Sequence, residues 1–181
     1  MNKAIFWDLH GTLGGDAVAG IEEFEPYPFS AEALTMAKGN GFLNIVITNQ
    51  SRIGKGELPL SVYERESVRI LRCFNREHKL IEEILCCPHT GDDNCDCKKP
   101  KVGLIKKSAA KYDLEITQCY VIGDMGKNEI VMARNAGCKG VLVLTGGGRN
   151  SLGKFRQTWA EYEADIVAEN ALEAVRSIIQ E

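Results

Sequence analysis

The chain has 181 residues, with 22 Lys and Arg against 25 Asp and Glu, and a formal net charge of −3 at pH 7. This length allows a substantial core, so we expect a single domain over residues 1–181. A general nucleic-acid binder is disfavoured, because no basic excess is available to neutralise phosphates. No apolar run approaches the length of a membrane span, and the N-terminus leads into a strand pattern instead of a signal peptide. The sequence therefore predicts a cytoplasmic protein without a membrane or nucleic-acid partner.

Strands and helices alternate along the chain. The expected strands are residues 4–7, 43–47, 81–87, 119–122, 140–144 and a short last one at 165–167. The expected helices are residues 30–38, 61–78, 102–112, 128–137 and a terminal helix from 170. Their expected N-caps are Ser30, Ser61, Asn128 and Asn170. This alternation predicts an α/β fold with a doubly wound, mostly parallel sheet.

The remaining segments predict loops. Gly, Pro and acidic residues fill residues 14–29, which are too few for an inserted domain. Residues 53–59, 88–100 and 146–148 are likewise expected to be loops. Any site on this fold is therefore expected to be covered by loops alone.

Three expected strands end in polar residues: Asp8 with His10, Thr48 with Asn49, and Asp124. Such ends meet at one edge of a parallel sheet, so these side chains are expected to surround one crevice. Two carboxylates there suit Mg²⁺, which prefers few carboxylates, water and phosphate oxygens. The alternative for Asp8 alone is that it starts a turn, as Asp often does.

Phosphate binding is expected close to these strand ends. The Thr48 hydroxyl and the amides around it suit phosphate oxygens, and Lys98, Lys99 and Lys101 bring positive charge. The alternative for the lysines is a solvated basic turn.

Seven cysteines are unevenly distributed. Cys73, Cys119 and Cys138 lie in apolar contexts, whereas the other four are clustered at Cys86, Cys87, Cys95 and Cys97. An odd, clustered set in a chain without an export signal is typical of metal binding in a reducing compartment.

The segment 87–97, here called the zinc loop, has the spacing Cys-x-His-x₅-Cys-x-Cys. Its four ligands, Cys87, His89, Cys95 and Cys97, suit a closed and therefore structural tetrahedral Zn²⁺ site, and binding would order the loop. Strand alternation turns Cys86 the other way, into the core. The loop leads into Lys98 and Lys99, so we expect it to position those cations. The alternative is a thiol cluster without metal.

The chain resembles the haloacid dehalogenase-like phosphatases over nearly its whole length. Their first motif, Asp-x-Asp-Gly-Thr, corresponds to Asp8, His10, Gly11 and Thr12. The later motifs correspond to Thr48, Lys99 and Asp124. The run Thr48-Asn49-Gln50-Ser51 and the zinc loop resemble the branch with the heptose bisphosphate and histidinol-phosphate phosphatases.

This resemblance implies a Rossmann-like fold with strand order 3-2-1-4-5 and no large cap domain. It implies that Asp8 attacks phosphorus to form an aspartyl-phosphate, with Mg²⁺ held by Asp8, the His10 carbonyl and Asp124. Lys99 would neutralise phosphate and restrain Asp8. The expected substrate-binding residues are Thr48, Asn49, Gln50, Arg52, Lys98 and Lys99.

The sequence departs from the family pattern at several positions. His10 replaces the acid that protonates the leaving group and activates water, work that imidazole performs near neutral pH. The alternative is a packed histidine without a proton role. Asn128 stands where another Asp is frequent, and helix capping is sufficient to explain it. Arg52 replaces a common Gly, and Lys55 replaces a common Arg, which alters phosphate recognition.

Two functions remain open at this point. The first is a Mg²⁺-dependent phosphatase, expected to be a monomer, that acts through Asp8 on a small phosphorylated metabolite such as a sugar phosphate or bisphosphate. The second is a catalytically weakened member of the fold that binds a phosphorylated ligand or a protein. His10 and Asn128 motivate the second, whereas the retained Asp8, Lys99 and Asp124 favour the first.

Overall fold

The computed structural model describes residues 1–16 and 19–180, and part of the expected loop at 14–29 therefore lies outside the described residues. Within them, one sheet of six parallel strands has the order β3-β2-β1-β4-β5-β6. The strands are β1 (Lys3–Trp7), β2 (Phe42–Asn49), β3 (Glu83–Cys87), β4 (Tyr120–Gly123), β5 (Lys139–Val143) and β6 (Ile166–Ala168). The predicted parallel sheet and the order 3-2-1-4-5 are confirmed, with β6 added beside β5.

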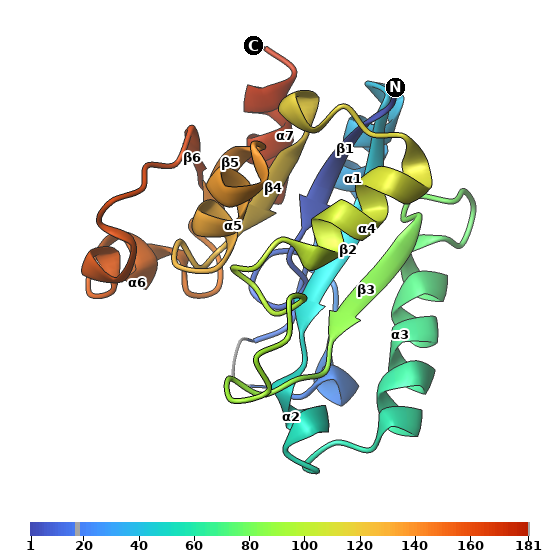
Figure 1. Cartoon of the computed structure of the whole chain (residues 1–181). Coiled ribbons are helices and arrows are strands. Elements are labelled where there is room, and N and C mark those ends of the chain that lie inside the picture. Colours follow the sequence, from blue (N-terminus) through green and yellow to red (C-terminus); the bar gives the residue numbers. More distant parts are fainter. Residues whose placement is uncertain (17–18, 181) are drawn as a thin grey trace.

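Helices cover both faces of the sheet, and both termini lie at the same end (Figure 1). The α-helices are α1 (Ser30–Gly39), α2 (Ser51–Gly54), α3 (Leu60–Phe74), α4 (Gly103–Tyr112), α5 (Glu129–Ala136), α6 (Gly148–Leu152) and α7 (Ala171–Ile178). The part of the chain that the structure describes also has the short 3₁₀ helices η1 (Ile21–Glu23), η2 (Ile116–Gln118) and η3 (Arg156–Trp159). Among the described residues, no helix is both long enough and apolar enough to cross a membrane.

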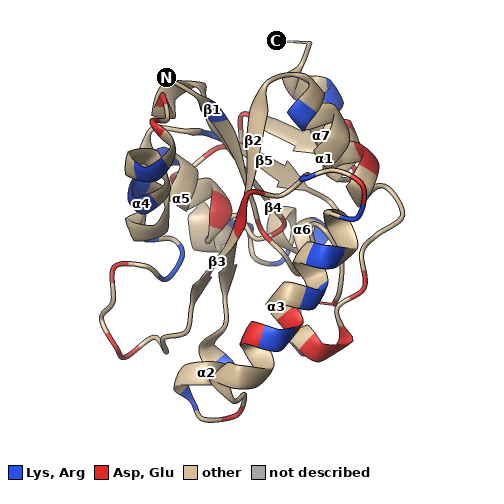
Figure 2. Cartoon of the chain, turned by 90° about the vertical axis from the view of Figure 1, so that its right-hand side faces the viewer, with Lys and Arg blue, Asp and Glu red and all other residues tan. Residues whose placement is uncertain are grey.

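The central strand β1 explains the two-sided core. Ile5 and Trp7 point into one apolar cluster, with α1, α3 and α7, whereas Ala4 and Phe6 point into the other, with α4 and α5. This is the period-two alternation of a strand, and both sets are apolar because both faces of a parallel sheet are covered. Charged side chains lie mainly on the helices and loops, and the strands are mostly tan in Figure 2.

Three predicted helix boundaries were wrong. Ser30 is the first residue of α1, not its cap, and its hydroxyl donates to the Leu13 carbonyl at 2.8 Å. Pro59 takes the N-cap position of α3, because its carbonyl accepts the amides of Val62 and Tyr63. The Ser61 capping box therefore does not form. The third error was the end of α3.

The helix α3 ends at Phe74, earlier than expected, because the Asn75 side chain binds the backbone of Leu80 and Ile81. The segment 146–148, expected to be a loop, also differs: Gly148 already begins α6. Asn170 does cap α7, since its side chain accepts the amides of Leu172 and Glu173 at 2.9 and 3.0 Å.

One buried polar side chain links three elements of the core. Asn44 on β2 accepts a hydrogen bond from the Trp7 indole at 2.9 Å, and its amide donates to the carbonyls of Leu34 and Leu80, both at 2.9 Å. Asn44 has no exposed surface. A buried polar group is tolerated only when it is satisfied, and this one satisfies three partners at once.

We expect Asn44→Ala to lower the free energy of unfolding by about 3 kcal/mol, because the buried Trp7 indole and Leu34 carbonyl and the partly buried Leu80 carbonyl all lose this partner. Chemical denaturation measures the change. The control is Asn40→Ala, which removes one exposed bond to the Met36 carbonyl and should cost about 0.5 kcal/mol or less. Equal losses for both variants would contradict the role of Asn44.

Candidate active site

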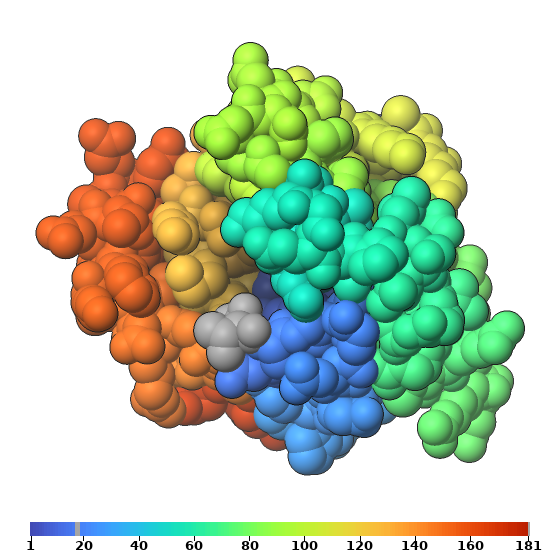
Figure 3. Space-filling model, turned by 90° about the horizontal axis from the view of Figure 1, so that it is seen from below, coloured from blue at the N-terminus to red at the C-terminus, as the bar shows by residue number. Residues whose placement is uncertain are grey.

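The polar strand ends meet at the carboxyl edge of the sheet, as the sequence predicts. Asp8 follows β1, Thr48 lies near the end of β2, and Asp124 follows β4. They share a cavity of about 410 Å³. In the view from below, a hollow opens between the blue, teal and orange segments, with dark blue atoms at its bottom (Figure 3). The cavity is lined by Asp8, His10, Ala19, Thr48, Asn49, Gln50, Ser51, Arg52, Lys55, Lys99, Asp124, Met125, Lys127, Asn128 and Glu129.

Lys99 is the buried cation of this cavity. Its ammonium binds the Asp8 carboxylate, lies 2.8 Å from Glu129 Oε1, and donates to the Ile47 carbonyl at 3.0 Å. Burial alone would lower the pKa of Lys99, but the charges of Asp8 and Glu129 outweigh it and raise the pKa above its usual value. Lys99 therefore remains an ammonium and restrains Asp8.

Glu129 is the site residue that the sequence interpretation missed. Its side chain is 1% exposed, binds Lys99 through one oxygen and accepts the Met125 amide at 3.0 Å through the other. Burial raises the pKa of Glu129 to about 7, against the attraction of Lys99. The sequence did offer a signal for it: Glu129 is an acid that directly follows Asn128 and lies four residues after Met125.

Asn128 lies at the helix start that the sequence predicts, but it does not make the expected capping contact. It stands at the N-cap position of α5, but its side chain makes no capping hydrogen bond, so the favoured capping explanation was wrong. The side chain lines the cavity instead. The acid that the family pattern suggests at this position is thus supplied by the next residue, Glu129.

Asp124 is enclosed by backbone. Its Oδ2 accepts the Gly147 amide at 2.6 Å, and Gly11 and Gly146, both with positive φ, approach the same oxygen. A Cβ at either glycine would overlap the carboxylate. Burial, followed by the negative charge of Asp8, raises the pKa of Asp124 to about 8.

The His10 ring lines the cavity and makes a T-shaped contact with the Phe24 ring, at a centroid distance of 5.6 Å and 82° between the planes. Its Nε2 is buried and has no hydrogen-bond partner among the described residues. Burial lowers the pKa of His10 below its usual value, and the positive charge of Lys99 acts in the same direction. The imidazole is therefore neutral near pH 7 and has one ring nitrogen available for a ligand.

Of the other predicted binding residues, some line the cavity and one binds only protein groups outside it. The Thr48 hydroxyl accepts the Gln50 side-chain amide at 2.9 Å, and Asn49 Oδ1 accepts the Lys99 amide at 3.1 Å. Arg52 reaches across the cavity rim to Glu22, 3.6 Å away. Lys98, however, is not among the lining residues. Its ammonium binds the Ser51 hydroxyl and the His89 carbonyl.

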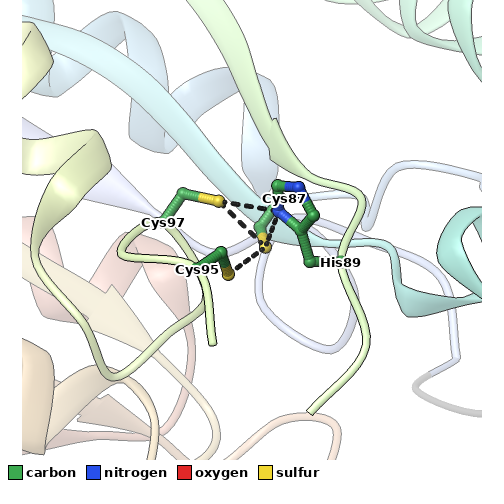
Figure 4. Close-up of side chains that lie close together, drawn as sticks. All are labelled: Cys87, His89, Cys95 and Cys97. Atoms are coloured by element: carbon green, nitrogen blue, oxygen red, sulfur yellow. Dashed lines mark hydrogen bonds between the residues drawn. The ribbon is translucent and has the colours of Figure 1, made fainter. Parts of the chain in front are cut away.

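The four predicted zinc ligands converge. The ligand atoms of Cys87, His89, Cys95 and Cys97 all lie within 4.8 Å of one another (Figure 4). The Cys87 sulfur is 3.7 Å from Cys95 Sγ and 3.2 Å from Cys97 Sγ. A tetrahedral ion with Zn–S bonds of about 2.3 Å requires sulfurs about 3.8 Å apart, so the residues fit such an ion. Cys86 points to the opposite core, as predicted.

The zinc loop is joined to the cavity by its backbone. The carbonyls of Cys87, Pro88 and His89 accept the Gln50 amide, the Gly54 amide and the Ser51 hydroxyl at 2.8, 2.8 and 2.9 Å. These donors begin and end α2, which also carries Arg52. The loop therefore supports the cavity rim on one side and leads into Lys99 on the other.

A divalent cation also fits the base of the cavity. Three carboxyl groups, Asp8, Asp124 and Glu129, face a single ammonium there, and Asp124 and Glu129 have raised pKa values. Carboxylate oxygens are the ligands that Mg²⁺ prefers, and its charge would offset the excess of negative groups.

Comparisons with known proteins identify the family of the chain. A family profile described as HAD-hydrolase-like matches residues 96–174. A D-glycero-beta-D-manno-heptose-1,7-bisphosphate 7-phosphatase of Pseudomonas putida is 33% identical over 155 residues, which cover 84% of this chain and 88% of that protein. The histidine biosynthesis bifunctional protein HisB of Buchnera aphidicola is 31% identical over 144 residues, 77% of this chain and 40% of that protein.

Among solved structures, the D,D-heptose 1,7-bisphosphate phosphatase of B. bronchiseptica, complexed with magnesium and phosphate, superposes with a TM-score of 0.86. It is 26% identical, and the match covers 99% of both chains. The chain therefore belongs to the haloacid dehalogenase-like phosphatases and is a hydrolase. Within them it belongs to the branch of the heptose bisphosphate and histidinol-phosphate phosphatases, as the motifs predict.

The raised pKa of Asp124 predicts a pH-dependent effect of Asp124→Asn in protein without added Mg²⁺. The folded state keeps this proton up to about pH 8, whereas the unfolded state releases it near pH 3.8, so folding loses stability as the pH rises between these values. Asn carries no such penalty. The melting temperature of the variant, relative to wild type, should therefore rise from pH 5 to pH 9.

The control for this measurement is Glu161→Gln, which changes an exposed carboxylate and should give a nearly constant difference over the same range. A difference between Asp124→Asn and wild type that shrinks towards pH 9 would contradict the assignment of a buried, proton-holding Asp124.

Proposed function

We propose that the protein is a Mg²⁺-dependent phosphatase that removes one phosphate from a sugar bisphosphate, such as a heptose 1,7-bisphosphate, through an aspartyl-phosphate on Asp8. The observation that carries the proposal is the buried contact of Asp8 with Lys99, at the bottom of a cavity that Asp124 also lines. Relatives named for this activity support the substrate class.

In the first step, an Asp8 oxygen attacks phosphorus, and the bond between phosphorus and the sugar oxygen breaks. Lys99 and the Thr48 hydroxyl bind the phosphoryl oxygens and orient them for this attack. When Asp8 is esterified it no longer carries a full charge, and Glu129 then keeps Lys99 in place. Water attacks the aspartyl-phosphate in the second step and restores Asp8 with release of phosphate.

His10 is proposed to move the proton in both steps. Its Nε2 is buried, faces no partner among the described residues and lies at the cavity. As imidazolium it donates to the departing sugar oxygen, and as neutral imidazole it then accepts a proton from the attacking water. The lowered pKa favours the second task, whereas the approach of a phosphate dianion favours the first.

The residues fit Mg²⁺ held by the carboxylates of Asp8 and Asp124 and by the His10 carbonyl. Bound there, the ion would offset the negative charge that gathers on the phosphoryl oxygens.

The cavity rim supports a substrate with a second anionic group. Arg52, Lys55 and Lys127 line the rim, whereas Lys99 is already neutralised at the bottom. Arg52 is 44% exposed, and its partners Glu22 and Glu57 are at 3.6 and 4.0 Å, so its guanidinium retains donors for a ligand. A second phosphate on the leaving group would bind these cations.

We also propose that Cys87, His89, Cys95 and Cys97 hold a structural Zn²⁺. All four positions are filled by protein ligands, which leaves none for a substrate. The hydrogen bonds from the zinc loop to α2 and its continuity with Lys99 give the ion a supporting role in phosphate binding.

The proposed nucleophile predicts that Asp8→Asn lowers kcat on sugar bisphosphates with Mg²⁺ by about 10³-fold or more, since the amide does not form the ester. Phosphate release measures turnover. Asp113→Asn is the matched control and should retain activity, because this exposed carboxylate lies beside the Met1 amino group.

In the same assay, His10→Asn should lower kcat by about 10²–10⁴-fold, the usual contribution of a general acid or base. Equal turnover by wild type and Asp8→Asn would reject the phosphatase proposal. It would favour the alternative, a weakened member of the fold that binds phosphorylated ligands.

The zinc proposal predicts that purified wild type contains about one zinc per chain by elemental mass spectrometry and that Cys95→Ser contains far less. The variant should also show a raised KM, because the loop that supports Arg52 and Lys99 is released. Cys73→Ser, at a cysteine outside the cluster, should keep its zinc. Equal zinc contents in both variants would refute this assignment.

A further inference from the structure

Residues 145–159, which follow β5 and belong to none of the family motifs, contact the candidate metal site. We call this segment the brace. Its first contact is with Asp124 itself: the Gly147 amide, at the N-cap of α6, donates to Oδ2 at 2.6 Å. The Thr145 hydroxyl also donates to the Gly11 carbonyl at 2.6 Å and so joins the brace to the loop after β1.

The second contact lies two residues beyond Asp124. The Ser151 hydroxyl accepts the Gly126 amide at 2.7 Å, and Ser151 is only 1% exposed. Ser151 also donates its own amide to the Gly147 carbonyl at 2.8 Å. One turn of α6 therefore binds the Asp124 carboxylate at one end and the following loop at the other.

The third contact is made by Trp159, which binds the Ser151 backbone. The Trp159 indole donates to the Ser151 carbonyl at 3.1 Å, and its ring lies directly against Gly126, where any Cβ would overlap it. Trp159 is 2% exposed. The Arg156 guanidinium stacks 4.1 Å from the Trp159 ring and donates to the Trp159 carbonyl, so the ring has little freedom.

We infer that the brace sets the Mg²⁺ affinity of the site, with Ser151 and Trp159 as positioning residues that act through Asp124. Oδ2 of Asp124 is occupied by Gly147, so the orientation of the carboxylate depends on where α6 lies. Outer partners that orient a metal ligand commonly change metal affinity by about 10- to 100-fold when removed. This inference rests on the proposed function, which assigns Mg²⁺ to Asp124.

The test is calorimetric titration of the substrate-free protein with Mg²⁺ alone. Ser151→Ala removes the acceptor of the Gly126 amide and should weaken Mg²⁺ binding about tenfold. Trp159→Phe keeps an aromatic ring over Gly126 but loses the donor to Ser151, and should weaken binding in the same direction by a smaller factor. At saturating Mg²⁺ the kcat of both variants should return to the wild-type value, which a general loss of structure would not allow.

Ser177→Ala is the matched control, because it removes a hydroxyl that donates to the Glu173 carbonyl in α7, away from the site. It should bind Mg²⁺ as wild type does. Wild-type affinity in Ser151→Ala overturns the inference, and if that variant does not fold, wild-type affinity in Trp159→Phe overturns it. A wild-type protein that binds no Mg²⁺ would overturn the proposed function and the inference together.

Discussion

The active-site edge depends on one buried charge arrangement, in which the Lys99 ammonium lies between the carboxylates of Asp8 and Glu129. A lone ammonium in this position would be unstable, since its side chain is 3% exposed and desolvation favours the neutral form. The carboxylates of Asp8 and Glu129 reverse that preference, and the ammonium also donates to the Ile47 carbonyl. The cost of removing one partner from such a group is high, because an uncompensated buried charge would remain. The group therefore links the ends of β1 and β2 to the start of α5.

The surrounding elements hold this charge arrangement in place from three sides. Asn49 at the end of β2 binds the backbone of Lys99 through both its amide and its carbonyl. The zinc loop precedes Lys99 and is hydrogen-bonded to both ends of α2. On the opposite side, α6 binds Asp124 and the loop that leads to Glu129. Loops and short helices thus hold the charge arrangement in place, and the cavity stays open to a ligand.

The sequence predicts the parts of this arrangement that follow a simple period or spacing. Strand ends of a parallel sheet share an edge, which was enough to bring Asp8, Thr48 and Asp124 together, and the cysteine spacing was enough for the zinc loop. The sequence does not predict which of two adjacent side chains makes a given tertiary contact. Asn128 and Glu129 are adjacent acceptors at a helix start, and only packing against Lys99 decides which of them enters the ion pair. Lys98 and Lys99 are adjacent ammonium groups, and only the direction of the backbone decides that one faces the cavity and the other Ser51.

Two of the departures from the family pattern, at positions 10 and 128, affect the same quantity, the charge at the bottom of the cavity. Histidine at position 10 and asparagine at 128 each remove one carboxylate that the pattern suggests, and Glu129 restores one of them beside Lys99. Fewer carboxylates around Asp8 mean less repulsion towards an approaching phosphate dianion, because like charges in a buried site interact strongly. In the proposed mechanism, proton transfer is assigned to an imidazole, whose charge changes near neutral pH instead of at the low pH typical of a carboxylate. The substitutions are therefore physically consistent with one another, and they favour an altered phosphatase over a site that has merely lost its catalytic groups.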